Sequence, residues 1–189
     1  LTTKTELKLE TMKGPVECKL QKDGNITVNM GAPRLQPDCI PFIADATQIS
    51  YNLQLEDGLC ANRTSIDISA VSMGNPHAVL LVEDVDTASV KTLGPVLETH
   101  ARFPQGVNVG FMEVIDRKNI RLRVYERGTG ETRACGSGAC AAVVTGRLQG
   151  LLEEEVNVHL PGGTLTIEWK GDDSPVLQTG PACRVYEGH

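Results

Sequence analysis

The segment from Gly136 to Gln149 constrains the fold more than any other part of this chain. Its length and its flanking residues predict a helix, and Gly150 is a suitable residue to cap its end. The centre of this helix is apolar on every face, with the residues Ala139, Cys140, Ala141, Ala142, Val143 and Val144. A helix without a polar face must be buried on every side, so we expect strands to wrap around it.

Short runs of alternating polar and apolar residues elsewhere in the chain predict strands with one buried face. These runs occupy residues 24–30, 65–72, 119–126, 155–160 and 163–169. The turn residues Pro161, Gly162 and Gly163 separate the last two runs, which predicts an antiparallel hairpin over residues 155–169.

A weaker helical pattern runs from Asp86 to about Leu93, is interrupted by Gly94-Pro95 and resumes to Arg102. Together these elements predict an α+β fold, in which a curved, barrel-like, mostly antiparallel sheet is wrapped around one central helix of small residues. The proline-rich stretch at 33–41 is a candidate crossing between two domains.

The composition of the 189-residue chain argues against several classes of protein. Its net charge of -6 and the lack of any basic run disfavour a nucleic-acid surface. No apolar stretch approaches the roughly 20 residues needed to span a bilayer, and residues 1–10 lack the apolar core of a secretion signal. We therefore expect a cytoplasmic protein with neither a membrane nor a nucleic-acid partner.

The chain has six cysteines, and without an export signal we expect them to be reduced thiols. No two of them have the close spacing of a zinc site, and the four histidines are scattered, so we expect no metal. Five of the cysteines lie in contexts that would not activate a thiol and are interpreted as structural: Cys18, Cys39, Cys60, Cys140 and Cys183.

Cys135 differs because it lies in a loop of glycines and charged residues, immediately before the predicted buried helix. The free N–H groups of a helix N-terminus favour a thiolate and lower the pKa of a cysteine placed there. Neighbouring glycines leave the amides of Gly136 and Ser137 open to an anion such as a carboxylate. Residues 135–137 therefore offer a base and a carboxylate-binding site; the alternative is a small apolar side chain in a capping loop.

The strand at 119–126 ends at Glu126 and is followed by Arg127, which brings a carboxylate and a guanidinium to the same end of the fold as Cys135. Arginine can bind a carboxylate through two hydrogen bonds, and glutamate can accept from an ammonium group or orient the thiol. The pair therefore suits a zwitterion, although a surface ion pair is an equally good interpretation.

Three further polar residues are candidates for a site. Asn75 and His77 occur in a Gly-Asn-Pro-His sequence between two strands, where a turn and a general base are equally good interpretations. Asn108 lies in an alternating run between Gly106 and Gly110 and indicates little by itself.

Three segments closely resemble the diaminopimelate epimerase family, namely MGNPHAVLLVEDVD, TLGPVLETHARFPQGVNVGFM and RLRVYERGTGETRACGSGACAAVV. The similarity runs through the whole chain. It implies the fold of that family and a cofactor-independent isomerase that interconverts LL- and meso-diaminopimelate, on the route to lysine and to the peptidoglycan precursors of the bacterial cell wall.

The resemblance also implies a mechanism with two cysteines on opposite faces of the substrate α-carbon, one a thiolate base and the other a thiol acid. Cys135 matches one of them, and the backbone N–H groups of Gly136 and Ser137 would bind the reacting carboxylate. Donors at helix N-termini suit this chemistry, because removal of the α-proton develops negative charge that needs stabilisation.

At the far end of the substrate, the resemblance implies that Asn75, Asn108 and Arg127 hold the distal carboxylate. Glu126 would receive the distal ammonium group and lie near Cys135. His77 would lie near the opposing cysteine.

Members of the family carry a preceding domain that holds the second cysteine in a Cys-Gly loop. No such loop precedes Leu1 in this sequence. We interpret residues 1–35 as closing strands of an incomplete first domain, 36–180 as the second epimerase domain, and 181–189 as a terminal strand that returns to the first. We expect the chain alone to be inactive. The expected partners are diaminopimelate and the missing first domain, and a homodimer is left open.

Two other functions are compatible with the sequence: a related cofactor-independent amino-acid racemase or isomerase, and a non-catalytic carboxylate-binding module. Arg127 and the two asparagines favour a substrate with a second amino-acid end. Thiol reactivity separates catalysis from binding alone, since a poised nucleophile at Cys135 would be alkylated rapidly, whereas a packed thiol would react slowly.

Overall fold

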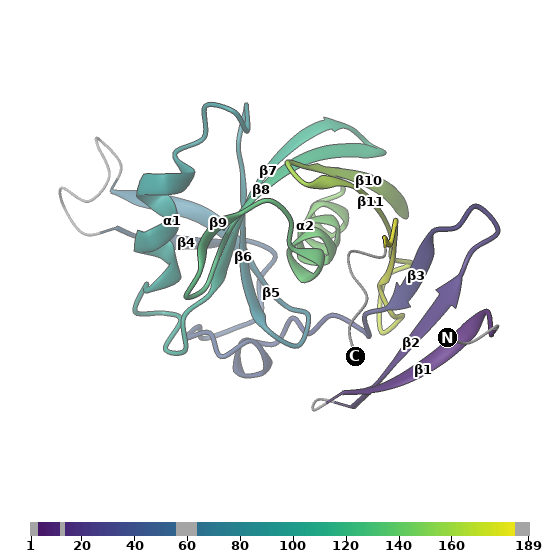
Figure 1. Cartoon of the computed structure of the whole chain (residues 1–189). Helices are drawn as coiled ribbons and strands as arrows, with labels where there is room; N and C mark the ends of the chain where they lie inside the picture. The colour runs from purple at the N-terminus through teal and green to yellow at the C-terminus, as the bar shows by residue number, and fades with distance from the viewer. Residues whose placement is uncertain (1–3, 12–13, 56–63, 184–189) are drawn as a thin grey trace.

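A computed structural model describes residues 4–11, 14–55 and 64–183 of the chain (Figure 1). The elements in chain order are β1 (Glu6–Thr11), β2 (Gly14–Leu20), β3 (Ile26–Asn29), η1 (Pro37–Cys39), β4 (Tyr51–Gln54), β5 (Ser65–Ser72), β6 (Pro76–Leu81), α1 (Val90–Glu98), β7 (Asn108–Asp116), β8 (Asn119–Glu126), β9 (Gly130–Thr132), α2 (Gly136–Leu148), β10 (Glu155–Leu160), β11 (Gly163–Glu168) and β12 (Leu177–Gly180). The strands form one sheet in the order β1-β2-β3-β12-β11-β10-β8-β7-β6-β5-β4, with β9 paired to β8.

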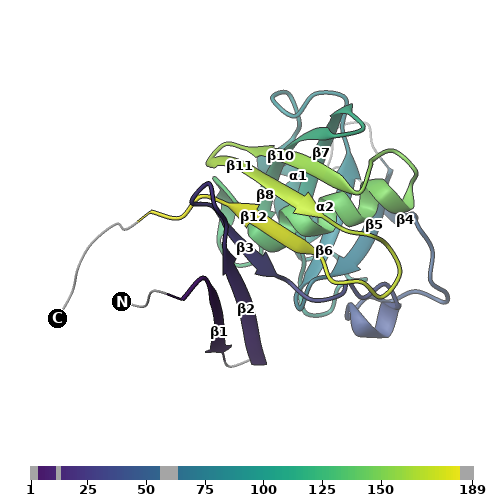
Figure 2. The same cartoon turned by 90° about the vertical axis from the view of Figure 1, so that its right-hand side faces the viewer.

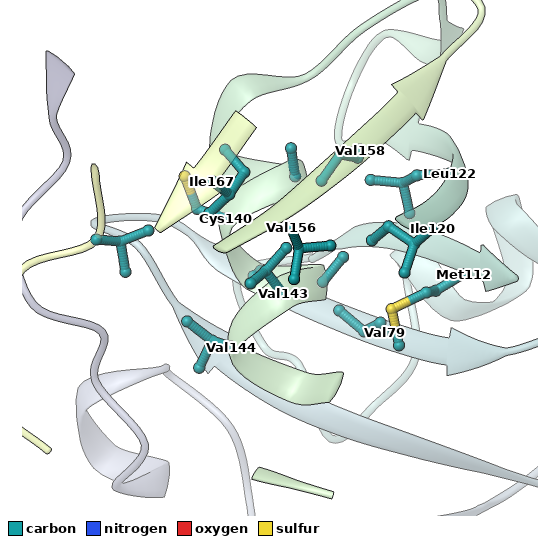
Figure 3. Packing of buried hydrophobic residues seen from close by; sticks show 14 of the residues in the cluster. Val79, Met112, Ile120, Leu122, Cys140, Val143, Val144, Val156, Val158 and Ile167 are labelled. Atoms are coloured by element: carbon teal, nitrogen blue, oxygen red, sulfur yellow. The ribbon is translucent and has the colours of Figure 1, made fainter. Parts of the chain in front are cut away.

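The helix α2 lies at the centre of the fold (Figure 1). Every residue from Gly138 to Gly146 is buried. The helix contacts β5, β6, β7, β8, β11 and β12, and apolar side chains from the sheet pack around it (Figure 3). The prediction of a curved sheet wrapped around a small-residue helix is therefore confirmed.

Residues 30–34 connect the two margins of the sheet around α2. Met30 donates to the carbonyl of Val176, just before β12, and Val176 donates to the carbonyl of Gly31. Arg34 then exchanges two backbone hydrogen bonds of 2.9 Å with Ser72, at the end of β5. The segment thus completes the barrel-like enclosure, with β11 and β12 crossing in front of α2 in Figure 2.

Pairing within the sheet is mostly antiparallel, as expected. β10 and β11 form the predicted hairpin. The parallel pairs are β6 with β7 and β8 with β10, and their order could not be inferred from the sequence. The strands predicted at 65–72, 119–126 and 155–160 coincide with β5, β8 and β10, whereas those at 24–30 and 163–169 are slightly longer than β3 and β11.

The strands β1, β2 and β3 extend the sheet beyond β12 (Figures 1 and 2). One face of this extension carries charged pairs between β1 and β2, Lys8 with Glu17 and Lys19 with Glu6. These pairs are exposed, so they contribute little to stability.

The opposite face of the extension, here called the apolar face of β1–β3, continues the side of the sheet that covers α2. This continuity follows from the register, because Val28 lies opposite Gln178 of β12, and Gln178 lies opposite Ile167 of β11. Its residues are half-buried or exposed in the described structure: Leu7, Leu9, Val16, Cys18, Leu20, Ile26 and Val28.

A second core contains apolar residues of β4 to β7 and the buried side of α1. The predicted break at Gly94-Pro95 was wrong, because α1 is one helix with Pro95 inside it, and residues 86–89 and 99–102 are not helical. A Cβ on Gly94 would lie 2.6 Å from the ring of Tyr125, so the helix rests directly on β8. This packing outweighs the single backbone hydrogen bond that a proline cannot donate.

The terminal strand predicted at 181–189 is not seen in residues 181–183. The remainder of that prediction, like Cys60, lies outside the described residues. No helix in the described part of the chain is both long enough and apolar enough to cross a membrane.

Candidate active site

The ends of three strands and the start of α2 meet at one end of the barrel. His77 in β6 lies opposite Asn108 at the start of β7, and Val109 lies opposite Tyr125 near the end of β8. α2 begins at the same end, since a Cβ on Gly138 would lie 3.4 Å from the side chain of Val124. The topology therefore gathers polar residues from four segments that are distant in sequence.

Cys135 immediately precedes α2 and has an extended backbone, with φ −141° and ψ 109°. It is 7% exposed, and its Sγ lies 3.6 Å from Oγ of Ser137. The first N–H groups of a helix have no acceptor within it, which leaves the amides of Gly136 and Ser137 available beside the thiol.

Burial raises the pKa of the Cys135 thiol above its ordinary value. Ser137 and Gly138 act in the opposite direction, whereas the nearby Glu126 carboxylate raises the pKa further. The expected lowering of this pKa at the helix N-terminus was therefore wrong for the described chain. The loss of solvent around the sulfur outweighs the polar groups that favour a thiolate.

Glu126 is held beside Cys135 by the hairpin of β8 and β9. Its Oε1 accepts a hydrogen bond of 2.5 Å from the hydroxyl of Thr132, the last residue of β9. The carboxylate thus accepts from a hydroxyl donor and lies near the thiol.

His77 is 1% exposed, and its Nε2 lies 3.1 Å from Oδ1 of Asn75. Burial, assisted by the positive charge of Arg127, lowers the pKa of His77 to about 3. The imidazole is therefore neutral near pH 7 and donates its Nε2 proton to the Asn75 carbonyl, which leaves Nδ1 as an acceptor.

Asn108 joins three of the converging segments. Its Nδ2 donates to the carbonyl of Pro76 at 3.0 Å, and its Oδ1 accepts from the backbone N–H of Arg127 at 3.0 Å. Arg127 in turn donates from Nη1 to the carbonyl of Gln105 at 2.6 Å. Gly106 has a φ of +70°, and a Cβ there would lie 2.9 Å from the Arg127 side chain, so glycine allows the close approach.

The residues proposed from the sequence thus form two neighbouring groups. One group surrounds the start of α2 and contains Glu126, Cys135, Gly136 and Ser137. The other contains Asn75, His77, Asn108 and Arg127. The consecutive residues Glu126 and Arg127 connect the two groups. Within the described residues, no three His, Cys, Asp or Glu side chains gather as metal ligands would.

Two polar residues at this end were not identified from the sequence. Thr132 could have been found, because the glycine-rich turn after Glu126 predicts that the chain folds back on the strand. Gln178 of β12 could not, because no local pattern predicts its position against the first turn of α2. A Cβ on Gly136 would lie 2.6 Å from Gln178 Oε1, and Cys140 Sγ donates to the same oxygen at 3.8 Å.

Solved structures of several other proteins share this fold. A phenazine biosynthesis protein of the PhzF family from Bacillus anthracis is similar with a TM-score of 0.60 and 15% identity, over 96% of this chain and 67% of its own. A hydroxyproline epimerase from Agrobacterium vitis has a TM-score of 0.58 and 17% identity, over 95% of this chain and 58% of its own. These likenesses define the class of fold.

The sequence comparisons are more specific. A sequence model described as diaminopimelate epimerase matches residues 69–185. The diaminopimelate epimerase of Ectopseudomonas mendocina is 55% identical over 188 residues, covering 100% of this chain, and that of Thioalkalivibrio sulfidiphilus is 55% identical over 189 residues, also covering 100%. The chain belongs to the diaminopimelate epimerase family. It spans 66% of the length of each of these two relatives.

Proposed function

We propose that this chain supplies one half of the active site of an epimerase that interconverts LL- and meso-diaminopimelate, in the synthesis of lysine and peptidoglycan precursors. One observation carries the proposal: Cys135 lies at the start of a buried helix, beside available backbone amides and near the Glu126 carboxylate. This combination suits proton transfer next to a carboxylate, and the family membership supports diaminopimelate as the substrate.

Cys135 would exchange a proton with the substrate α-carbon. Because burial raises the pKa of its thiol, the resting form in the described chain is the thiol, which can protonate the carbon from one face. In the reverse direction the thiolate would remove that proton. The N–H groups of Gly136 and Ser137 would bind the α-carboxylate and stabilise the charge that develops on it, without a cofactor.

The second group of polar residues would bind the distal end of the substrate. Arg127, Asn75 and Asn108 would receive the distal carboxylate, and Glu126 would accept from the distal ammonium group. The neutral His77 would lie on the side from which the second cysteine approaches.

We further propose that a second domain supplies the opposing cysteine. Two observations support this: the relatives are longer than this chain, and the apolar face of β1–β3 is uncovered in the described structure. In this proposal, residues 1–35 and 181–189 belong with that domain, and residues 36–180 form the domain of Cys135. The 189-residue chain by itself would then not epimerise diaminopimelate, because one face of the α-carbon has no acid.

The test joins this chain to the preceding third of the Ectopseudomonas mendocina relative and follows LL- and meso-diaminopimelate by chiral chromatography. The joined protein should interconvert the two isomers, and the 189-residue chain alone should not. Turnover by the chain alone would contradict the two-domain proposal. Failure of a folded joined protein to act on diaminopimelate, with activity on another amino acid, would contradict the substrate.

A further inference from the structure

Thr132 touches the proposed catalytic group although it has no place in the proposed substrate-binding set. It ends β9, which runs back along β8 after the turn at 127–129. Thr132 lies opposite Val124, so its side chain projects from the same face as Glu126, two residues further along β8. The hydroxyl reaches diagonally across the hairpin and donates to Glu126 Oε1 at 2.5 Å.

This hydrogen bond joins the two strands of the hairpin through their side chains. It fixes one carboxylate oxygen of a half-buried side chain that stands at the end of a strand, just before an exposed turn. A carboxylate has lone pairs for several donors, so Glu126 can still accept from the Cys135 thiol.

We propose that Thr132 is a positioning residue, whose hydroxyl holds the Glu126 carboxylate against the Cys135 thiol. The inference rests on the proposed function, in which Cys135 transfers the proton, and it deepens that function by assigning the orientation of Glu126 to a neighbouring hydroxyl. Without the hydroxyl, the glutamate side chain turns towards solvent and the thiol loses its acceptor.

The experiment measures the alkylation rate of Cys135 by iodoacetamide as a function of pH in the 189-residue chain, with each cysteine peptide followed by mass spectrometry. Glu126→Gln removes the negative charge that favours the thiol, so alkylation near pH 7 should accelerate. Thr132→Val should accelerate it in the same direction but less, by roughly threefold. The matched control Thr132→Ser retains the hydroxyl and should react like the parent chain.

The double variant Thr132→Val/Glu126→Gln separates positioning from a structural role. If the hydroxyl acts through the carboxylate, its loss has no further effect once the charge is gone. An equal change in both backgrounds would overturn the proposal, as would unchanged alkylation in Thr132→Val. Circular dichroism establishes folding, and if the valine variant does not fold, Thr132→Ala replaces it in both backgrounds.

These measurements do not involve diaminopimelate. Failure of the joined protein to interconvert the substrate would therefore contradict the proposed function and leave the alkylation result standing. Conversely, turnover by the joined protein with no Thr132 effect on Cys135 would overturn the positioning role alone.

Discussion

One row of directly paired residues crosses the sheet from β10 to β1, and its two halves have opposite surroundings. In order, the row is Val156, Ile167, Gln178, Val28, Cys18 and Leu7. The first two are completely buried in the core around α2, whereas the last three are only partly buried in the described structure. The alternation of apolar residues is alike in both halves. It identifies the apolar face of a strand but not what covers that face.

The largest expected effect compares one substitution in the two halves of the row. Val156→Ala leaves a cavity beside α2 and should lower the free energy of unfolding by about 2 kcal/mol. Val28→Ala removes the same atoms from the uncovered half and should cost less than about 1 kcal/mol. Urea unfolding of the 189-residue chain measures both, and equal losses would show that the halves do not differ in packing.

Buried His77 of β6, which lies outside this row, should make the stability of the chain depend on pH. The pKa of His77 is near 6.5 when exposed and about 3 when buried, so below pH 6.5 the unfolded chain binds more protons than the folded chain. Stability should therefore be lost as the pH falls, by about 1 kcal/mol between pH 6.5 and 5.5. Urea unfolding at several pH values gives the free energy of unfolding as a function of pH. This free energy should fall less steeply with falling pH in His77→Gln, and an unchanged pH dependence would contradict the burial of a neutral imidazole.

The uncovered half should make the chain associate through the apolar face of β1–β3. Light scattering should give an average mass that rises with concentration. Leu9→Lys/Leu20→Lys changes two residues of this face that are 49% and 46% exposed, and should restore the mass of a monomer. Thr27→Lys on the polar face is the matched control; a monomeric parent chain, or an equal effect of this control, would argue against the apolar face as the cause.

The smallest expected effect concerns the boundary residue Gln178. Gly136→Ala places a methyl group against its carboxamide and should destabilise the chain by about 0.5–1 kcal/mol, because the flexible side chain can move aside. Gln178→Ala should remove this penalty in the double variant. If the penalty persists there, the contact seen between Gly136 and Gln178 is not its source.

Much of the fold could be predicted because burial on every side leaves a clear pattern. The apolar run before Gly146 predicted α2 and the sheet around it, and alternation predicted five strands. The continuity of α1 could not be predicted, since it depends on Gly94 packing against Tyr125. The same limit applies to the parallel pairs and to the closure by Arg34 and Ser72, which join segments distant in sequence.

Some features of the candidate site could likewise be predicted from the sequence, and others could not. Residue types and glycine-rich turns identified Cys135, Glu126 and Arg127 as candidates, because their chemistry is local. The pKa of Cys135 could not be predicted, since its direction depends on how much solvent surrounds the sulfur, which is a property of the whole fold. Gln178 was not identified because its position against the first turn of α2 also depends on the whole fold.

The most direct test of the central role of Cys135 follows deuterium incorporation at the α-carbon of diaminopimelate by proton NMR in deuterated water. The protein is the joined chain described above, compared with its Cys135→Ala and Cys140→Ala variants. We predict loss of the α-hydrogen signal with the parent and with Cys140→Ala, and loss of epimerisation with Cys135→Ala. Epimerisation by a folded Cys135→Ala variant at the parent rate would contradict the assignment of Cys135 as a proton-transfer group.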